Sequence, residues 1–93
     1  MSVLSAHELR DALSSLGDWT VVDGALQRVV TGDDFASSIA FVNRVAEVAD
    51  AADHHPDLAI SWDTVTVRLV THSEGGITGK DAAMARTIDG LAA

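Results

Sequence analysis

The chain has 93 residues, no cysteine and a formal net charge of −8, because fourteen acidic residues oppose six basic ones. This length fits one domain over residues 1–93, and so small a core favours self-association as a way to bury more apolar surface. The acidic balance disfavours direct binding of nucleic acids or anionic membranes. No apolar run approaches the ~20 residues of a membrane span and no signal-peptide pattern opens the chain, so we expect a soluble, cytoplasmic protein.

The first predicted element is a short amphipathic helix. Ser5, with Glu8 three residues later, forms a capping box, an arrangement that satisfies free backbone amides at a helix start. Leucines then recur at helical spacing up to Gly17, which suits a helix end. His7 falls in the first turn of this helix and is expected to be a surface residue.

A hairpin is predicted next. Residues 19–22 and 26–31 have the composition of two antiparallel strands. Between them, Asp23-Gly24 readily adopts the positive backbone angles of a tight hairpin turn. Trp19, at the start of the first strand, is expected to pack in the core.

A long helix follows, capped by Asp33 or Asp34 and finished before Pro56. One apolar stripe runs along it at intervals of four and three, and a second set of residues widens that stripe. The stripe is Phe35, Ile39, Val42, Ala46 and Ala49, and the widening set is Phe41, Val45 and Val48. We expect such a helix to pack on a sheet along one side and to contact a neighbouring subunit with part of the rest.

A second hairpin is predicted after the long helix. Residues 58–62 and 65–69 alternate between apolar and other side chains, with a turn at Asp63-Thr64. Trp62 completes the first alternation and is therefore expected in the core, although an aromatic side chain can also stack on a planar ligand.

The last predicted helix opens with a capping box formed by Thr78 and Asp81. Its apolar face is formed by Ala82, Ala85, Ile88 and Leu91. The order helix, hairpin, helix, hairpin, helix predicts an α+β fold, in which an antiparallel sheet is covered by helices on one face.

Three histidines fall beside predicted loops, where functional sites commonly lie. His54 and His55 follow the long helix, and His72 follows the last strand. Imidazole has a usual pKa of about 6.5, so such a cluster suits acid–base chemistry near neutral pH. The same residues can equally be solvated loop residues or the ligands of a three-histidine metal site with one position open to water.

Four segments resemble the signature of the pterin-4a-carbinolamine dehydratase family in identity and in spacing. They are Ala52–Asp57, Leu69–His72, Gly75–Thr78 and Lys80-Asp81. The similarity continues upstream to Asp34-Phe35 and more loosely to Trp19. The resemblance implies an α+β fold, order α-β-β-α-β-β-α, with a four-stranded antiparallel sheet, three helices on one face and assembly as a homodimer or homotetramer.

The resemblance also implies a hydro-lyase reaction, the loss of water from a 4a-hydroxytetrahydropterin to give a quinonoid dihydropterin. This step belongs to tetrahydrobiopterin recycling, downstream of an aromatic amino-acid hydroxylase, and no cofactor or metal takes part. By family correspondence, His54 and His72 transfer protons and His55 mainly positions the pterin.

Four further residues are candidates for the substrate site. Asp53 can fix the tautomer of a neighbouring histidine, or it can simply end the helix. Pro56 stiffens the loop that presents the histidines. Asp81 matches a family position near the site, but its capping-box spacing already explains it structurally. Trp62 can stack on the pterin if it is not a core residue.

Two other functions remain open. Members of the family and similar proteins also act as non-catalytic binding proteins, which stabilise dimers of a transcription factor or assist the assembly of another enzyme. Such a role needs a partner surface and no histidine chemistry, so the intact His54, His55 and His72 favour the enzyme. A zinc-dependent hydrolase would instead require a hydrogen-bonding partner behind each histidine ligand.

Overall fold

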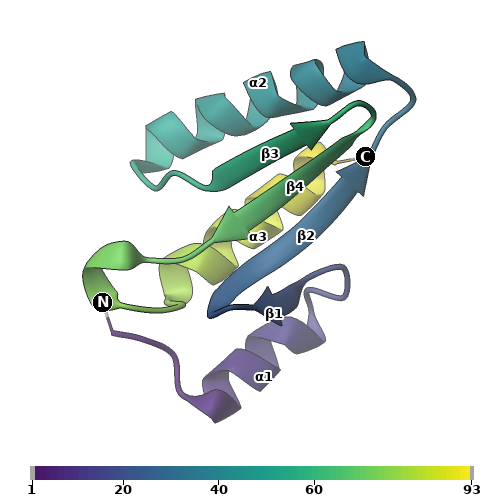
Figure 1. Cartoon of the computed structure of the whole chain (residues 1–93). Helices are drawn as coiled ribbons and strands as arrows, with labels where there is room; N and C mark the ends of the chain where they lie inside the picture. The colour runs from purple at the N-terminus through teal and green to yellow at the C-terminus, as the bar shows by residue number, and fades with distance from the viewer. Residues whose placement is uncertain (1, 93) are drawn as a thin grey trace.

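The computed structural model describes residues 2–92, and it consists of one four-stranded antiparallel sheet with three α-helices (Figure 1). The elements are α1 (Ala6–Ser14), β1 (Thr20–Val22), β2 (Ala25–Thr31), α2 (Phe35–Ala52), β3 (Asp57–Ser61), β4 (Thr64–Leu69), the 3₁₀ turn η1 (His72–Glu74) and α3 (Gly79–Leu91). The strand order is β1-β2-β4-β3, so β1 and β3 are the edge strands. The α+β fold and the element order expected from the sequence are confirmed.

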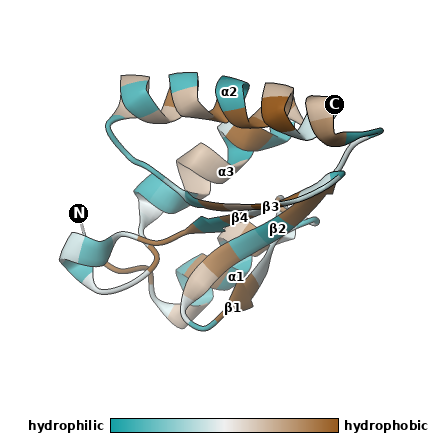
Figure 2. Cartoon of the chain, turned by 45° about the horizontal axis from the view of Figure 1, so that its top comes forward, coloured by the Kyte–Doolittle hydropathy of each residue, from teal (hydrophilic) through white to brown (hydrophobic). Residues whose placement is uncertain are grey.

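Helices α2 and α3 cover one face of the sheet, because only one face of its central strands is apolar. In β4, Val65, Val67 and Leu69 are buried and alternate with partly exposed residues. The antiparallel register places Val30 and Leu26 of β2 opposite Val65 and Leu69, on the same face. Figure 2 shows α2 and α3 lying on one side of the sheet, above this apolar surface. The core is therefore a layer between the sheet and the helices.

The start of the chain follows the local sequence signals. The capping box of Ser5 and Glu8 is present at the first turn of α1. In the hairpin that follows, Asp23 and Gly24 have φ angles of 49° and 78°, as expected of this turn pair. Trp19 is buried, and its indole N–H donates to Asp89 of α3 at 2.7 Å. This bond fastens the first hairpin to the last helix.

Asp34 caps α2, but the face that α2 buries differs from the predicted main stripe. The buried residues of the helix are Ser38, Phe41, Val45 and Ala49. Phe35 of the predicted stripe is 53% exposed, and Ala46 is exposed as well. The prediction was wrong in phase by about one residue, because both candidate stripes are apolar and only the position of the sheet decides between them.

Trp62 lies in a turn and not in the core. β3 ends at Ser61 and β4 begins at Thr64, so the two-residue connection is Trp62-Asp63, one residue earlier than predicted. Trp62 has a φ of 49° and is 67% exposed, so the expectation of a core residue was wrong. The pairing of β3 with β4 ends at Ser61, so the apolar alternation of β3 does not extend to Trp62. A bulky residue at positive φ is uncommon, and other contacts must stabilise this backbone conformation. That support comes from α2, where the Ser38 hydroxyl donates to the Trp62 carbonyl at 2.7 Å.

Within residues 2–92, no helix combines the length and the apolar composition that crossing a membrane requires.

Candidate active site

The way α2 ends determines where the histidine pair lies. Asp53 has a left-handed backbone with φ of 49°, and its N–H donates to the Asp50 carbonyl at 3.2 Å. The His54 N–H donates to the Ala49 carbonyl at 3.1 Å. Together these bonds form a Schellman motif, with an aspartate in the position that glycine usually takes. Of the two roles considered for Asp53, ending the helix is the one that the backbone geometry accounts for.

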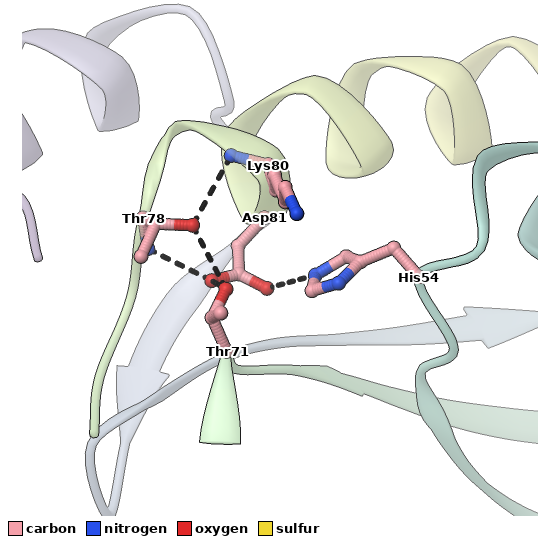
Figure 3. A network of polar contacts seen from close by, with 5 residues as sticks. All are labelled: His54, Thr71, Thr78, Lys80 and Asp81. Carbon is pink, nitrogen blue, oxygen red and sulfur yellow. Dashed lines mark hydrogen bonds and ion pairs between the residues drawn. The ribbon is translucent and has the colours of Figure 1, made fainter. Parts of the chain in front are cut away.

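The His54 imidazole lies in hydrogen-bond contact with the buried carboxylate of Asp81 in α3 (Figure 3). Its Nε2 lies 2.6 Å from Oδ1 of Asp81, and the two side chains are 13% and 0% exposed. Asp81 also accepts the Thr78 backbone N–H at 2.8 Å, so the predicted capping box of α3 is confirmed. The carboxylate therefore has two functions, because one oxygen caps the helix and the other holds the histidine.

Two threonine hydroxyls complete the surroundings of Asp81. Thr71 Oγ1 donates to Asp81 Oδ2 at 2.8 Å, and the hydroxyls of Thr71 and Thr78 are 2.8 Å apart. Oδ2 thus accepts two donors, and Oδ1 faces His54 Nε2, so a neutral His54 ring that donates to this carboxylate does so from Nε2. In the neutral ring, His54 Nδ1 is then the unprotonated nitrogen that can exchange a proton with a ligand.

His55 has a different environment from its neighbour. Its Nε2 lies 2.9 Å from Oδ1 of Asp50, in the last turn of α2, and both side chains are largely exposed at 58% and 79%. An exposed ion pair of this kind is worth at most ~1 kcal/mol and leaves the ring free to move. His55 can therefore adjust to a bound molecule, which His54 cannot. Pro56, partly buried, separates this pair from β3.

His72 begins the 3₁₀ turn η1 and is exposed. The turn is closed by Thr71, whose N–H donates to the Gly76 carbonyl at 2.9 Å. Because the Thr71 side chain bonds Asp81 and Asp81 bonds His54, the three residues connect the two histidine segments through hydrogen bonds. The structure thus brings His54, His55 and the turn of His72 to one end of the sheet.

A pocket of about 190 Å³ adjoins His54 between α2 and α3. It is lined by Ala52, His54, Lys80, Ala83, Met84 and Thr87. This volume is below the ~300–1,000 Å³ of pockets for drug-sized ligands, so it suits a small ligand or part of one. A larger hollow of about 320 Å³ lies at the opposite end of α2, and none of the three histidines lines it. Of the two, the smaller pocket is the one with a site histidine, His54, in its lining.

Trp62 is separated from this end of the molecule. It follows β3, whereas His55 precedes β3, and the five residues of that strand span roughly 16 Å at the usual strand rise. Within one chain, the indole of Trp62 and the histidine pair thus lie at opposite ends of the strand.

The histidines are not grouped as metal ligands. In the part of the chain that the structure describes, no three histidine, aspartate or glutamate side chains form an arrangement that could hold a metal ion. The Nε2 atoms of His54 and His55 instead face different aspartates, Asp81 and Asp50.

Sequence reasoning missed three residues of the site. Thr71 directly precedes His72, and Asp50 precedes His55 by five positions, a spacing that becomes a contact only because the helix end folds back. Thr78 was recognised as a helix cap, but its hydroxyl contact with Thr71 was not. The pairing of His54 with Asp81, 27 positions later, likewise depends on how α2 and α3 pack.

Comparison with known proteins identifies the family. The model of the family described as pterin 4 alpha carbinolamine dehydratase matches residues 2–91. A relative from Mycolicibacterium vanbaalenii, whose name places it among the pterin-4-alpha-carbinolamine dehydratases, is 55% identical over 91 residues, which are 98% of each chain. A relative of the same name from Thermosynechococcus vestitus is 48% identical, over 96% of this chain and 94% of its own.

Two solved structures share the fold. A transcriptional coactivator/pterin dehydratase from Brucella melitensis superposes with a TM-score of 0.94 and is 35% identical, over 99% of this chain and 100% of its own. A pterin dehydratase-like protein identified as a RuBisCO assembly factor in the alpha-carboxysome gives a TM-score of 0.65 at 20% identity, over 80% of this chain and 86% of its own. At that identity the second match shows the fold alone. The matches across nearly the whole chain show that it belongs to the pterin-4a-carbinolamine dehydratase family.

Proposed function

We propose that this chain catalyses the loss of water from a 4a-hydroxytetrahydropterin to give a quinonoid dihydropterin. The observation that carries the proposal is the pair of His54 and Asp81. One nitrogen of the His54 ring is fixed by a buried carboxylate, and the ring borders a small pocket. Membership of the family and the names of the relatives support the same reaction.

The reaction needs only proton transfers. The substrate carries a hydroxyl group and an amine nitrogen on the same carbon, so the nitrogen lone pair assists the breaking of the C–O bond. One proton is delivered to the departing oxygen and one is removed from the nitrogen, while a C=N bond forms and water leaves. No nucleophile, oxidant or reductant is required, and two positioned acid–base groups suffice.

We assign the two proton transfers to His54 and His72. His54 exchanges its proton through Nδ1, because Nε2 remains bound to Asp81. Asp81 is fully buried and so acts on the substrate only through His54, although it was first considered as a substrate-binding residue. His55, exposed and adjustable, positions the pterin, and Pro56 restricts the loop between the histidines and β3.

The direct test follows the ultraviolet spectrum of a synthetic 4a-hydroxytetrahydropterin with and without the protein. Since one positioned general acid contributes typically ~10²–10⁴-fold, we expect an acceleration of at least that order over the spontaneous reaction. An unchanged rate with correctly folded protein would rule the proposal out.

A binding role is the second candidate, and one surface feature favours it. Phe35, Ile60 and Trp62 are 53%, 41% and 67% exposed, and the Ser38–Trp62 hydrogen bond places the hairpin turn beside the start of α2. We call these three residues the apolar end patch. Exposed apolar side chains at one end of a small protein are typical of contact surfaces. If the protein does not dehydrate the pterin in the assay above, this patch favours the binding role.

The assembly, the cellular location and the source of the substrate are proposed as the sequence predicts them. We propose that the chain forms a homodimer or homotetramer, that it acts in the cytoplasm, and that its substrate is supplied by an aromatic amino-acid hydroxylase. The open edge of β3, together with the apolar end patch, supports self-association.

A further inference from the structure

We propose that Thr71 is a positioning residue, whose hydroxyl holds the carboxylate of Asp81 and thereby fixes the His54 ring relative to the turn that carries His72. The inference rests on the proposed function for its effect on turnover. The claim that Thr71 fixes the His54 ring concerns the substrate-free protein and does not depend on the proposed function. Neither the sequence pattern nor the family resemblance assigned a role to Thr71.

Thr71 belongs to the turn that carries His72 and also contacts the partner of His54. Its backbone closes the turn of His72, because its N–H donates to the Gly76 carbonyl at 2.9 Å and its carbonyl accepts the N–H of Glu74 and of Gly75, each at 3.0 Å. Its side chain bonds Asp81 at 2.8 Å. One residue therefore joins the backbone of one histidine segment to the partner of the other histidine.

Figure 3 draws the contacts of the Thr71 and Thr78 hydroxyls, and the donors available fix the direction of each bond. The Thr71 hydroxyl has a single proton, and it is donated to Asp81 Oδ2. The 2.8 Å contact between the two hydroxyls must then use the proton of Thr78, with Thr71 as the acceptor. Thr78 Oγ1 in turn accepts the backbone N–H of Lys80 at 3.2 Å. Each hydroxyl donates its one proton to the next group, so the bonds run in a single direction from Thr78 through Thr71 to the carboxylate.

The residues that hold the carboxylate are buried. Thr71 is 6% exposed, and Thr78 and Asp81 are 0% exposed. A hydrogen bond to a charged group is strong in such surroundings, and water cannot readily replace a missing donor. The carboxylate receives the Thr71 hydroxyl and the Thr78 N–H on one oxygen and His54 on the other. Loss of the hydroxyl leaves the Thr78 N–H as the remaining donor to that oxygen, so the carboxylate plane and the His54 ring gain freedom.

The test compares Thr71→Val, which keeps the shape and removes the hydroxyl, with Thr71→Ser, which keeps the hydroxyl. Thr66→Val on β4 is the matched control, because Thr66 lies on the face of the sheet opposite the helices. In the substrate-free protein, nuclear magnetic resonance of the His54 ring should show a proton on Nε2 that exchanges slowly with water. We expect Thr71→Val to lose this protected proton, and Thr71→Ser and Thr66→Val to keep it.

Turnover provides the second measurement. Displacing a catalytic group by about 1 Å can cost ~10²-fold, so we expect kcat of Thr71→Val to fall by up to that factor with KM little changed. Thr71→Ser should restore most of the rate. The spectra are recorded well below the melting temperature of each variant, so that unfolding does not imitate the effect.

Three results would overturn the inference: no protected His54 proton in the wild-type protein, an unchanged proton in Thr71→Val, or its equal loss in Thr71→Ser. If the wild-type protein does not dehydrate the pterin, the proposed function fails. The resonance measurement then still decides whether Thr71 positions His54.

Discussion

His54 and His72 differ in how firmly the structure holds them. His54 is mostly buried and bound at one ring nitrogen, whereas His72 stands exposed on a short 3₁₀ turn. A group that transfers a proton must be held within hydrogen-bond reach of the substrate atom. The bond to Asp81 fixes the His54 ring before a ligand binds, whereas His72 is positioned by the backbone of its turn.

This difference predicts different outcomes for the two alanine variants. His72→Ala should lower turnover by ~10²–10⁴-fold while stability changes by no more than ~0.5 kcal/mol, as for other exposed sites. His54→Ala should lower turnover similarly and also destabilise the fold by about 1–3 kcal/mol, because Asp81 Oδ1 loses its partner in a buried position. Turnover and urea unfolding measure the two effects. His7→Ala, at an exposed histidine of α1, is the control, and full turnover in both site variants would contradict the assignment.

Asp81→Asn tests the direction of the bond to His54. An amide can present an N–H to the ring, which then accepts at Nε2 and carries its proton on Nδ1. In serine proteases the corresponding change behind the catalytic histidine lowers kcat by about 10⁴-fold. We expect a loss between ~10²- and 10⁴-fold, with the pterin still binding, which steady-state kinetics and equilibrium binding separate. Unchanged kcat would show that His54 does not depend on this carboxylate.

The three histidines could be found from the sequence, but the hydrogen bonds that distinguish them could not. His54 and His55 are adjacent in the chain, yet one bonds Asp81 and the other Asp50. Which ring faces inward is decided by the left-handed conformation of Asp53, a backbone detail that no spacing rule specifies. The roles of the two residues therefore follow from the helix end and not from their identity.

At the scale of elements, α2 shows where sequence patterns stop being informative. Its length and a cap at Asp33 or Asp34 were predictable, because both depend on local signals, and the structure has Asp34 as the cap. Its buried face was not, since apolar residues cover more than half of its circumference and the sheet selects one part. The prediction that Trp62 lies in the core was wrong for a similar reason. The apolar alternation of β3 continues to Trp62 in the sequence, and only the pairing of Ser61 with Thr64 shows that the strand ends before it.

The cap of α2 gives the molecule a pH-dependent contribution to stability. The Asp34 carboxylate accepts the Ser37 backbone N–H and hydroxyl, each at 2.8 Å, and the backbone N–H is the main cause that lowers the pKa of Asp34 below its usual value. A lowered folded pKa means that this stability is present above the ordinary aspartate pKa and is lost as pH falls through the folded value. Asp34→Ala should therefore lower the melting temperature at neutral pH.

The same variant should differ progressively less from the wild-type protein as the pH falls through the acidic range, because Asp34 becomes protonated there. Melting curves at a series of pH values measure this convergence. Asp33→Ala removes the same charge from the neighbouring position without removing the cap, so it is the matched control. A stability difference for Asp34→Ala that is constant with pH would contradict the role of the charged cap.

At the scale of the whole molecule, the two edges of the sheet are differently protected. Within residues 2–92 the sheet is open, and its edge strands are β1, with three residues, and β3, with five. β3 carries no lysine, and Asp57 at its start is its one charged residue, so the edge lacks the charged side chains that usually prevent pairing with another chain. The apolar end patch continues this edge at the turn. The net charge of −8 opposes close contact between copies, but physiological salt screens charges beyond ~8 Å.

These features predict that the chain self-associates through the apolar end patch. Light scattering and sedimentation should give a dimer or tetramer for the wild-type protein, and Trp62→Ser should shift the population towards monomer at equal concentration. A buried tryptophan at the centre of an interface is commonly worth 2 kcal/mol or more, so the dissociation constant should rise at least ~30-fold. Val29→Ser is the control. Val29 is 54% exposed on the face of the sheet opposite the helices, so this change should leave the assembly intact. A monomeric wild-type protein, or equal behaviour of the two variants, would remove the patch as the interface and leave the edge of β3 without an assigned partner.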